Sequence, residues 1–136
     1  MNVEAEVLFL NESFYHVFRQ RDLSMMARLW AEKLPVACAH PGWPVISGRE
    51  EVLASWKAIL TNSDAPSVSC HGAQAFVSSR DAGFVVCYEK VGNSVLVASN
   101  LFAREHGEWR MVHHQAGPCN LSPLALEDEA GAGLMQ

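Results

Sequence analysis

Hydrophobic side chains follow two different periods along the chain. Before Ser67 they recur every three or four positions, which is the period of a helix with one buried face. From Ser67 onward they recur at every second position, which is the period of half-buried strands. The first pattern predicts three helices, over 3–20, 23–31 and 47–60. The second predicts four long strands, over 67–78, 83–91, 95–104 and 108–116.

Local signals mark the ends of the predicted helices. Asp22 is a suitable N-cap for the second helix, and Ser47 with Glu50 three residues later matches a capping box for the third. Between these two helices, residues 36–40 and 45–46 predict two short strands joined by a turn that is rich in Pro and Gly.

The order of the elements predicts an α+β fold, because the helices come first and the strands last instead of alternating. With short turns the long strands must be antiparallel, so we expect a curved antiparallel sheet with three helices on one face. The 136 residues suffice for one domain, predicted over 1–120. The tail, 121–136, is rich in Ala, Gly and acidic residues, and its end is expected to be mobile.

Two tight turns predict which strand residues face each other. Counting from Gly92-Asn93 pairs Val85 with Asn100, and counting from His106-Gly107 pairs Asn100 with His113. One sheet face then carries Glu89, Asn100, Phe102, His113 and Gln115. The other carries Phe84, Val86, Tyr88, Val97, Leu101, Val112 and His114. A slip of one residue would exchange the two faces.

Both predicted faces are largely apolar, so both need a cover. Three helices cover one face, and a second copy of the chain is expected to cover the other. The second face is the more uniformly aliphatic and aromatic. The expected homodimer therefore forms through Phe84, Val86, Tyr88, Val97, Leu101, Val112 and His114.

Charge and composition exclude several partners. The net charge is −5 and no basic cluster is present, which argues against nucleic acid. No apolar run approaches the length of a membrane span, and no secretory leader is evident, so a cytoplasmic protein without membrane contact is expected. The four cysteines form no CxxC pair and are expected to be small buried side chains, with no metal site and no cofactor.

The polar residues on the helix-covered face have two interpretations. A buried Glu89, Asn100 and His113 must be hydrogen-bonded, either to each other as a structural network or to a ligand. His40 ends a short strand before a Pro-Gly turn and could equally line a cavity or bond to the backbone. Tyr15, near the end of the first helical stripe, could likewise reach solvent or a pocket.

Several local runs resemble one family. They are Asp22-Leu23, Ala39-His40-Pro41-Gly42-Trp43, Ser47-Gly48-Arg49-Glu50, Ala98-Ser99-Asn100-Leu101-Phe102 and Trp109-Arg110-Met111-Val112-His113-His114. With the order of elements, they resemble the SnoaL-like and nuclear transport factor 2-like superfamily, which includes ketosteroid isomerase and the cystatin-like α+β folds. The last run is also similar to the oligomerisation domain of calmodulin-dependent kinase. The resemblance covers 3–118.

The resemblance implies a cone-shaped sheet with the helices on its concave face and a dimer through its convex face. It also implies a pocket, whose expected ligand-binding residues are Tyr15, Trp30, His40, Trp43, Trp56, Glu89, Asn100, Phe102, His113 and Gln115. The isomerase positions do not match residue for residue, since its base falls at Ala39 or His40 and its tyrosine at Phe14. Acid–base candidates are then His40, Glu89 and His113, with His40 and His113 as the candidate catalytic residues.

Three functions remain open at this point. The first is a pocket that binds an unknown small apolar or aromatic molecule without chemistry. The second is a cofactor-free lyase, isomerase or cyclase in which His40 or His113 moves a proton beside a carbonyl. The third is a structural dimerisation module whose pocket is unused.

Overall fold

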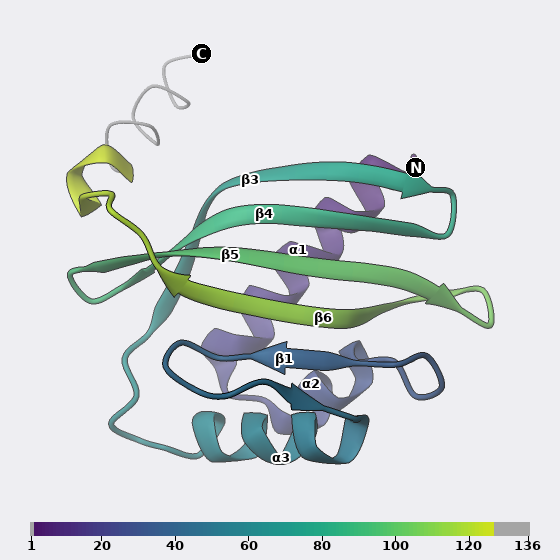
Figure 1. Ribbon diagram of the computed structural model, residues 1–136, viewed down its shortest axis with the longest axis horizontal. Coiled ribbons are helices and arrows are strands. Elements are labelled where there is room, and N and C mark those ends of the chain that lie inside the picture. Colours follow the sequence, from purple (N-terminus) through teal and green to yellow (C-terminus); the bar gives the residue numbers. More distant parts are fainter. Residues whose placement is uncertain (1, 127–136) are drawn as a thin grey trace.

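The computed structural model describes residues 2–126 and has the predicted α+β architecture (Figure 1). Its helices are α1 (Val3–Gln20), α2 (Leu23–Leu29) and α3 (Arg49–Leu60). Its strands are β1 (Ala37–Ala39), β2 (Ile46–Ser47), β3 (Val68–Ser79), β4 (Ala82–Val91), β5 (Ser94–Glu105) and β6 (Glu108–Pro118). Residues 123–126 add one helical turn, and the predicted mobile end of the tail lies outside the described residues.

The helix ends follow the expected chemistry, with one exception. Asn2 caps α1 and Asp22 caps α2, each accepting a backbone N–H with its side chain. The predicted capping box at Ser47 is wrong. Ser47 belongs to β2, and Gly48, with a φ of 89°, takes the N-cap position of α3 without a side-chain hydrogen bond.

The six strands form one sheet in the order β2-β1-β6-β5-β4-β3, and α1 crosses one of its faces (Figure 1). The sheet is mixed, because β1 pairs parallel with β6. The prediction of a wholly antiparallel sheet is therefore wrong at this pair. The long strands β3 to β6 are antiparallel to one another as expected, since only short turns connect them.

The segment between α2 and β1 is held by a single carboxylate at the end of β5. Glu105 accepts backbone N–H groups from Glu32, Lys33 and Leu34 at 2.9, 2.5 and 2.8 Å. These hydrogen bonds lower the pKa of Glu105 to about 2. The contact holds the segment that precedes β1 against the β5–β6 hairpin. β1 then pairs with β6 of that hairpin.

The register of the β4–β5 hairpin is as predicted, with Val85 opposite Asn100. The register of β5–β6 matches the prediction only from the turn to the Phe102–Met111 pair. A bulge then inserts Val112, so that Leu101 pairs with His113 and Asn100 pairs with His114. Beyond the bulge, every β6 side chain faces the side opposite to the one predicted.

The bulge exchanges the two histidines. His114 is fully buried on the side of the helices, whereas His113 is half-buried on the other side and Gln115 is exposed. The predictions that His113 and Gln115 face the helices and that His114 lies on the outer face are therefore wrong. Val112, also assigned to the outer face, packs partly against the core.

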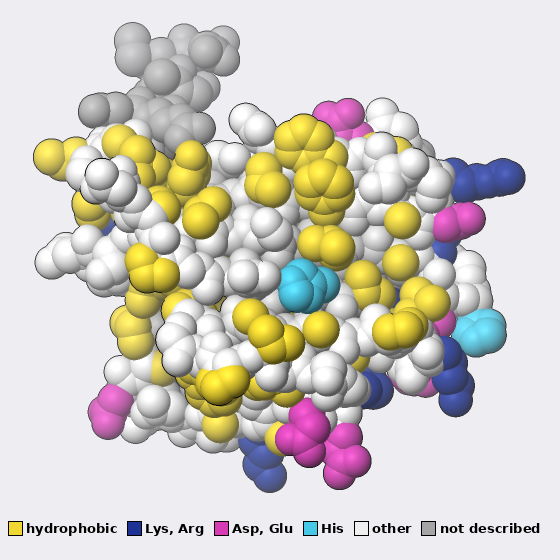
Figure 2. All heavy atoms as spheres, viewed as in Figure 1, with side chains coloured by type: hydrophobic (Ala, Val, Ile, Leu, Met, Phe, Trp, Pro, Cys, Tyr) yellow, Lys and Arg dark blue, Asp and Glu magenta, His cyan; other side chains and the backbone are white. Residues whose placement is uncertain are grey.

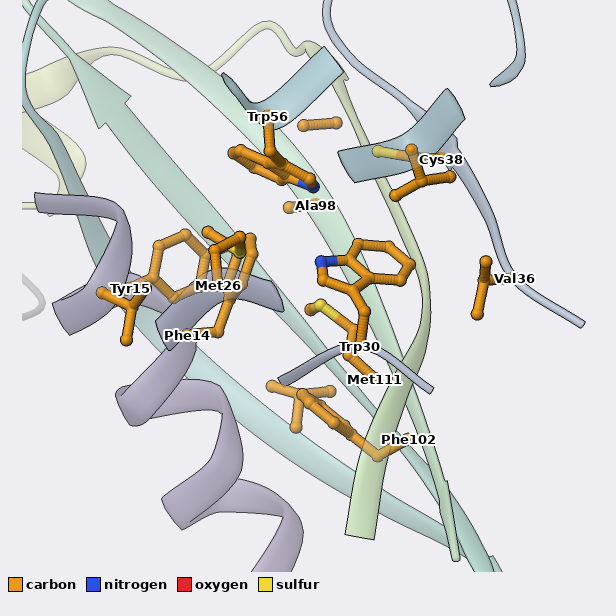
Figure 3. Packing of buried hydrophobic residues seen from close by; sticks show 14 of the residues in the cluster. Phe14, Tyr15, Met26, Trp30, Val36, Cys38, Trp56, Ala98, Phe102 and Met111 are labelled. Carbon is orange, nitrogen blue, oxygen red and sulfur yellow. The ribbon is translucent and has the colours of Figure 1, made fainter. Parts of the chain in front are cut away.

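The core fills the space between the helices and the sheet. Figure 3 shows Trp30, Met26 and Met111 close together there, with Phe14, Tyr15 and Trp56 nearby. The sheet face turned away from α1 carries hydrophobic side chains along its strands, and the charged groups lie mostly at its rim (Figure 2). Val97 on this face is 44% exposed, and Phe84, Val86, Tyr88 and Leu101 are half-buried.

Candidate functional site

A cavity of about 340 Å³ lies among the first helix, the β1–β2 hairpin and the long strands. Most of its walls are apolar. Its lining residues are Phe18, His40, Pro41, Trp43, Ile59, Ala65, Pro66, Val68, Glu89, Val91, Ser94, Leu96 and His114. Glu89 and His114 come from β4 and β6, so the sheet places a carboxyl group and an imidazole on one cavity that is otherwise mainly hydrophobic.

A buried hydrogen-bond network centred on Asn100 orients His114. The Asn100 amide donates from Nδ2 to Asn11 Oδ1 at 2.9 Å and to Tyr15 Oη at 3.1 Å. Asn100 Oδ1 lies 2.6 Å from His114 Nδ1. A carbonyl oxygen only accepts, so Nδ1 carries the proton and Nε2 carries the lone pair. Nε2 has no hydrogen-bond partner among the described residues.

The same network reaches Glu89 through Tyr15. The Tyr15 hydroxyl donates to Glu89 Oε2 at 2.6 Å and accepts from Asn100. Burial raises the pKa of Glu89, while the hydrogen bond from Tyr15 acts in the opposite direction. Burial, followed by the charge of Glu89, raises the pKa of Tyr15, so the hydroxyl keeps its proton.

His40 is fixed by α3. The Ser55 hydroxyl donates to the Val52 carbonyl at 2.6 Å, so its oxygen accepts from His40 Nε2 at 2.9 Å. The imidazole sits between the rings of Trp43 and Trp56, whose centroids are 5.1 and 4.7 Å away. Because Nε2 donates to Ser55, His40 Nδ1 is unprotonated. Two tryptophan rings pack against the imidazole.

Both imidazoles are uncharged at neutral pH. Burial lowers the pKa of His40 to about 4. Burial, followed by the nearby His40 and His113, lowers the pKa of His114 to about 3. The cavity therefore offers neutral nitrogen bases, and among the described residues that line it the acidic group is Glu89.

The ten predicted ligand-binding residues occupy four kinds of place. His40, Trp43 and Glu89 line the cavity. Tyr15, Asn100 and Trp56 lie directly behind it, bonded to or packed against lining residues. Trp30 and Phe102 belong to the core. His113 and Gln115 are on the other side of the sheet from the cavity.

His114 is the main residue that sequence reasoning missed. One signal pointed to it, because the predicted register put the polar Gln115 inside and the small Ala116 outside. A shift of one position puts His114 and Ala116 inside, where both are buried. Phe18 of α1 also lines the cavity and was not among the predicted site residues.

A comparison with protein families decides the relationship. The SnoaL-like domain family matches residues 7–119. The chain belongs to this SnoaL-like family.

One relative of this SnoaL-like chain is a longer plant protein. The chain is 28% identical over 124 residues to the F-box protein SKIP8 of Arabidopsis thaliana, covering 90% of this chain but only 52% of that protein. The chain thus spans about half the length of this relative.

Solved structures share the fold. A candidate dehydratase of the NTF2-like family from Streptomyces avermitilis is 29% identical, with a TM-score of 0.77 over 87% of this chain and 96% of that one. A candidate calcium/calmodulin-dependent protein kinase type II association domain from Thiobacillus denitrificans is 26% identical, with a TM-score of 0.67 over 82% and 93%. A Caulobacter vibrioides protein with a cystatin-like fold, 12% identical with a TM-score of 0.76 over 92% and 94%, shows the fold alone.

Within residues 2–126, no group of three or more His, Cys, Asp or Glu side chains is arranged to hold a metal ion. No helix in the described part of the SnoaL-like chain has the length and hydrophobicity needed to cross a bilayer.

Proposed function

We propose that this SnoaL-like protein binds a small, flat and mainly apolar molecule that carries one hydrogen-bonding group. The observation that carries the proposal is the apolar cavity of about 340 Å³ into which the sheet presents His114 and Glu89. Cavities of this size and character are typical of small-molecule sites, in which a few polar groups fix the orientation of the ligand.

The state of His114 indicates what the ligand offers. Its Nδ1 proton is used by Asn100, so Nε2 accepts a hydrogen bond from a hydroxyl or enol of the ligand. An uncharged ligand is favoured, because both imidazoles are neutral and the walls are hydrophobic. The aromatic rings of Trp43 and Phe18 suit a flat ring system.

The bicyclic alcohol 2-naphthol is a suitable probe. We expect it to bind with a Kd of about 10–100 μM, as the ligand efficiency of small aromatic compounds allows. Replacing His114 with Phe keeps a flat ring but removes the acceptor, and is expected to weaken 2-naphthol about fivefold, the value of one hydrogen bond. Affinities are measured by ligand-observed NMR, with folding checked by circular dichroism.

Two controls distinguish the contribution of the hydrogen bond to affinity from that of the shape of the cavity. The same His114→Phe change should leave the affinity for 2-methoxynaphthalene, which lacks a donor, nearly unchanged. Leu96→Trp fills the cavity and should abolish binding of both compounds, whereas Val97→Trp, one position along on the opposite face, should not. Binding that survives Leu96→Trp would place the ligand elsewhere.

Cofactor-free acid–base catalysis is a second candidate. It is favoured by a specific pairing in the cavity, namely a neutral imidazole with a free lone pair and a carboxyl group whose pKa is raised. His114 Nε2 would take a proton from the carbon next to a ketone, and protonated Glu89 would give its proton to the carbonyl oxygen, forming an enol. Tyr15 would hold the Glu89 carboxyl in place.

The matching reaction is hydrogen–deuterium exchange in 2-tetralone, a bicyclic ketone of similar size. Reversible enolisation in D₂O should replace its α-protons at a rate at least about 100-fold above buffer, the usual contribution of a positioned base. Proton NMR follows the loss, and His114→Phe should return it to the buffer rate. If 2-tetralone binds but does not exchange, the protein is a binding protein only.

We also propose that the sheet face opposite α1 pairs with a second copy of the chain. Phe84, Val86, Tyr88, Val97 and Leu101 form this face, and no helix of the described residues covers it. A large uncovered apolar face is characteristic of protein interfaces. The corrected register removes His114 from this surface and adds His113 to it.

A further inference from the structure

Two indole N–H groups in the core have no acceptor among the described residues. They belong to Trp30 and Trp56, whose side chains are fully buried, and no described atom accepts a hydrogen bond from either Nε1. An indole N–H can only donate. Because buried donors are almost always paired, with protein or with ordered water, these two call for an acceptor that the described residues do not supply.

The other two tryptophans of the chain differ in this respect. Trp109 Nε1 donates to the carboxylate of Glu6. Trp43 is 43% exposed, so solvent reaches its ring. The need for a further acceptor is therefore particular to the two core indoles.

The two core indoles converge from different elements. Trp30 follows α2 and forms a β-bridge with Met111 of β6, whereas Trp56 belongs to α3. Figure 3 shows their nitrogen atoms pointing toward each other between the two rings. Two donors cannot bond to each other, but one acceptor atom between them, about 2.9 Å from each nitrogen, could take both hydrogen bonds.

The surroundings of the two indoles favour a neutral acceptor. Trp56 packs against the rings of His40 and His114, at centroid distances of 4.7 and 5.6 Å, and both imidazoles are uncharged at neutral pH. The Arg49 guanidinium donates to the backbone carbonyl of Trp30 at 2.8 Å, so its charge is directed at the backbone and not at the indole. An anion would thus be desolvated without a partner of opposite charge, at a high cost.

We propose that Trp30 and Trp56 form a binding site for one internal water molecule, whose oxygen accepts a hydrogen bond from each indole. Water is neutral, small and able to accept two hydrogen bonds. Its own hydrogens meet weak acceptors, since the thioethers of Met26 and Met111 lie beside Trp30 (Figure 3).

The site is separate from the proposed ligand cavity, which neither indole lines. Its water joins α3 to the segment after α2. It therefore fixes the Trp56 ring, against which the two cavity imidazoles pack.

Nuclear Overhauser effects between water and the four indole protons test the proposal in the wild-type protein, with 15N-labelled tryptophan. We expect Trp30 and Trp56 to show the strong negative effects of a long-lived water. Trp43 should show only the weak effects of passing solvent, and Trp109, bonded to Glu6, should show no long-lived water. Trp43→Phe and Trp109→Phe assign their own signals, so the core pair is identified by elimination without a change in the core.

One core variant tests whether the two indoles share one water. Trp30→Phe keeps an aromatic ring but removes one donor, and should weaken the water effect at Trp56 about fivefold, the value of one hydrogen bond. Circular dichroism checks that the variant folds. An unchanged effect at Trp56 in the folded variant would mean that the indoles have separate partners, and would contradict the shared site.

Two results in the wild-type protein would overturn the proposal. The first is the absence of long-lived water at both core indoles, with their protons shifted upfield, because the N–H groups would then point into neighbouring rings. The second is an anomalous bromide peak between the two nitrogens in crystals soaked in sodium bromide, because the site would then select an anion. A single water peak within hydrogen-bond distance of both nitrogens is the expected crystallographic result.

Discussion

Replacing Asn100 with alanine is expected to lower the free energy of unfolding by about 3–5 kcal/mol, through the loss of several buried hydrogen bonds. Asn100 is fully buried and contacts His114, Asn11 and Tyr15 by hydrogen bonds of 2.6, 2.9 and 3.1 Å. Alanine leaves His114 Nδ1–H and Asn11 Oδ1 without these partners, and each unsatisfied buried group costs about 1–3 kcal/mol. Urea unfolding followed by circular dichroism measures the loss.

Ser99→Ala is the matched control. Ser99 is the neighbour of Asn100 on β5, and its side chain points to the opposite face of the sheet, where it is half-buried. Its removal should change the free energy of unfolding by no more than about 0.5 kcal/mol. If Asn100→Ala were as mild as Ser99→Ala, the network would be replaceable by water and would not be a main support of the fold.

Replacing Val97 with glutamate is expected to convert the proposed dimer to a monomer. Val97 is the most exposed of the five residues that form the uncovered face, at 44%. In a dimer, a carboxylate there would be buried against apolar side chains of the partner without a counter-charge. We expect the dimer Kd to rise at least about 100-fold, which corresponds to about 2.7 kcal/mol. Sedimentation velocity over a range of concentrations measures this change.

Val45→Glu is the control for the added charge itself. Val45 is 75% exposed beside the β1–β2 hairpin, away from the proposed interface. This variant should dimerise like the wild type. A Val97→Glu protein that remains dimeric would show that the copies associate through another surface, and a wild-type monomer would remove the dimer proposal altogether.

The helices and the β4–β5 hairpin could be predicted because local chemistry determines them. Asp22 caps its helix with its own side chain, and the Gly92-Asn93 turn sets a register that continues without interruption to Ala82. In such elements the residues that determine the structure lie within or next to the element itself. The predicted α+β class follows from the same local information.

The bulge at Val112 could not be predicted in this way. A bulge adds one residue to one strand, and no turn or cap signals its position. It is specified by packing, since it buries His114 and Ala116 and releases Gln115 to solvent. The parallel pairing of β1 with β6 is likewise a tertiary contact, made between residues more than seventy positions apart in the sequence.

The candidate site was predicted in outline and corrected in detail. His40, Trp43 and Glu89 were placed from sequence at the cavity where they lie, because the short hairpin and β4 were predicted correctly. His113 was chosen over His114 because of the register predicted beyond Phe102. That register is wrong, so the choice of histidine is wrong too. The proton positions on the two buried imidazoles required the hydrogen-bond partners themselves.

Asn100 also separates two of the titratable groups of the cavity, His114 and Glu89. The hydrogen bonds run from His114 through Asn100 and Tyr15 to Glu89, and the side chain of Asn100 is a carboxamide. A carboxamide accepts and donates hydrogen bonds without readily taking up or releasing a proton, so the chain of contacts does not conduct protons. A proton that passes between His114 and Glu89 must therefore travel through the cavity, carried by water or by the bound molecule.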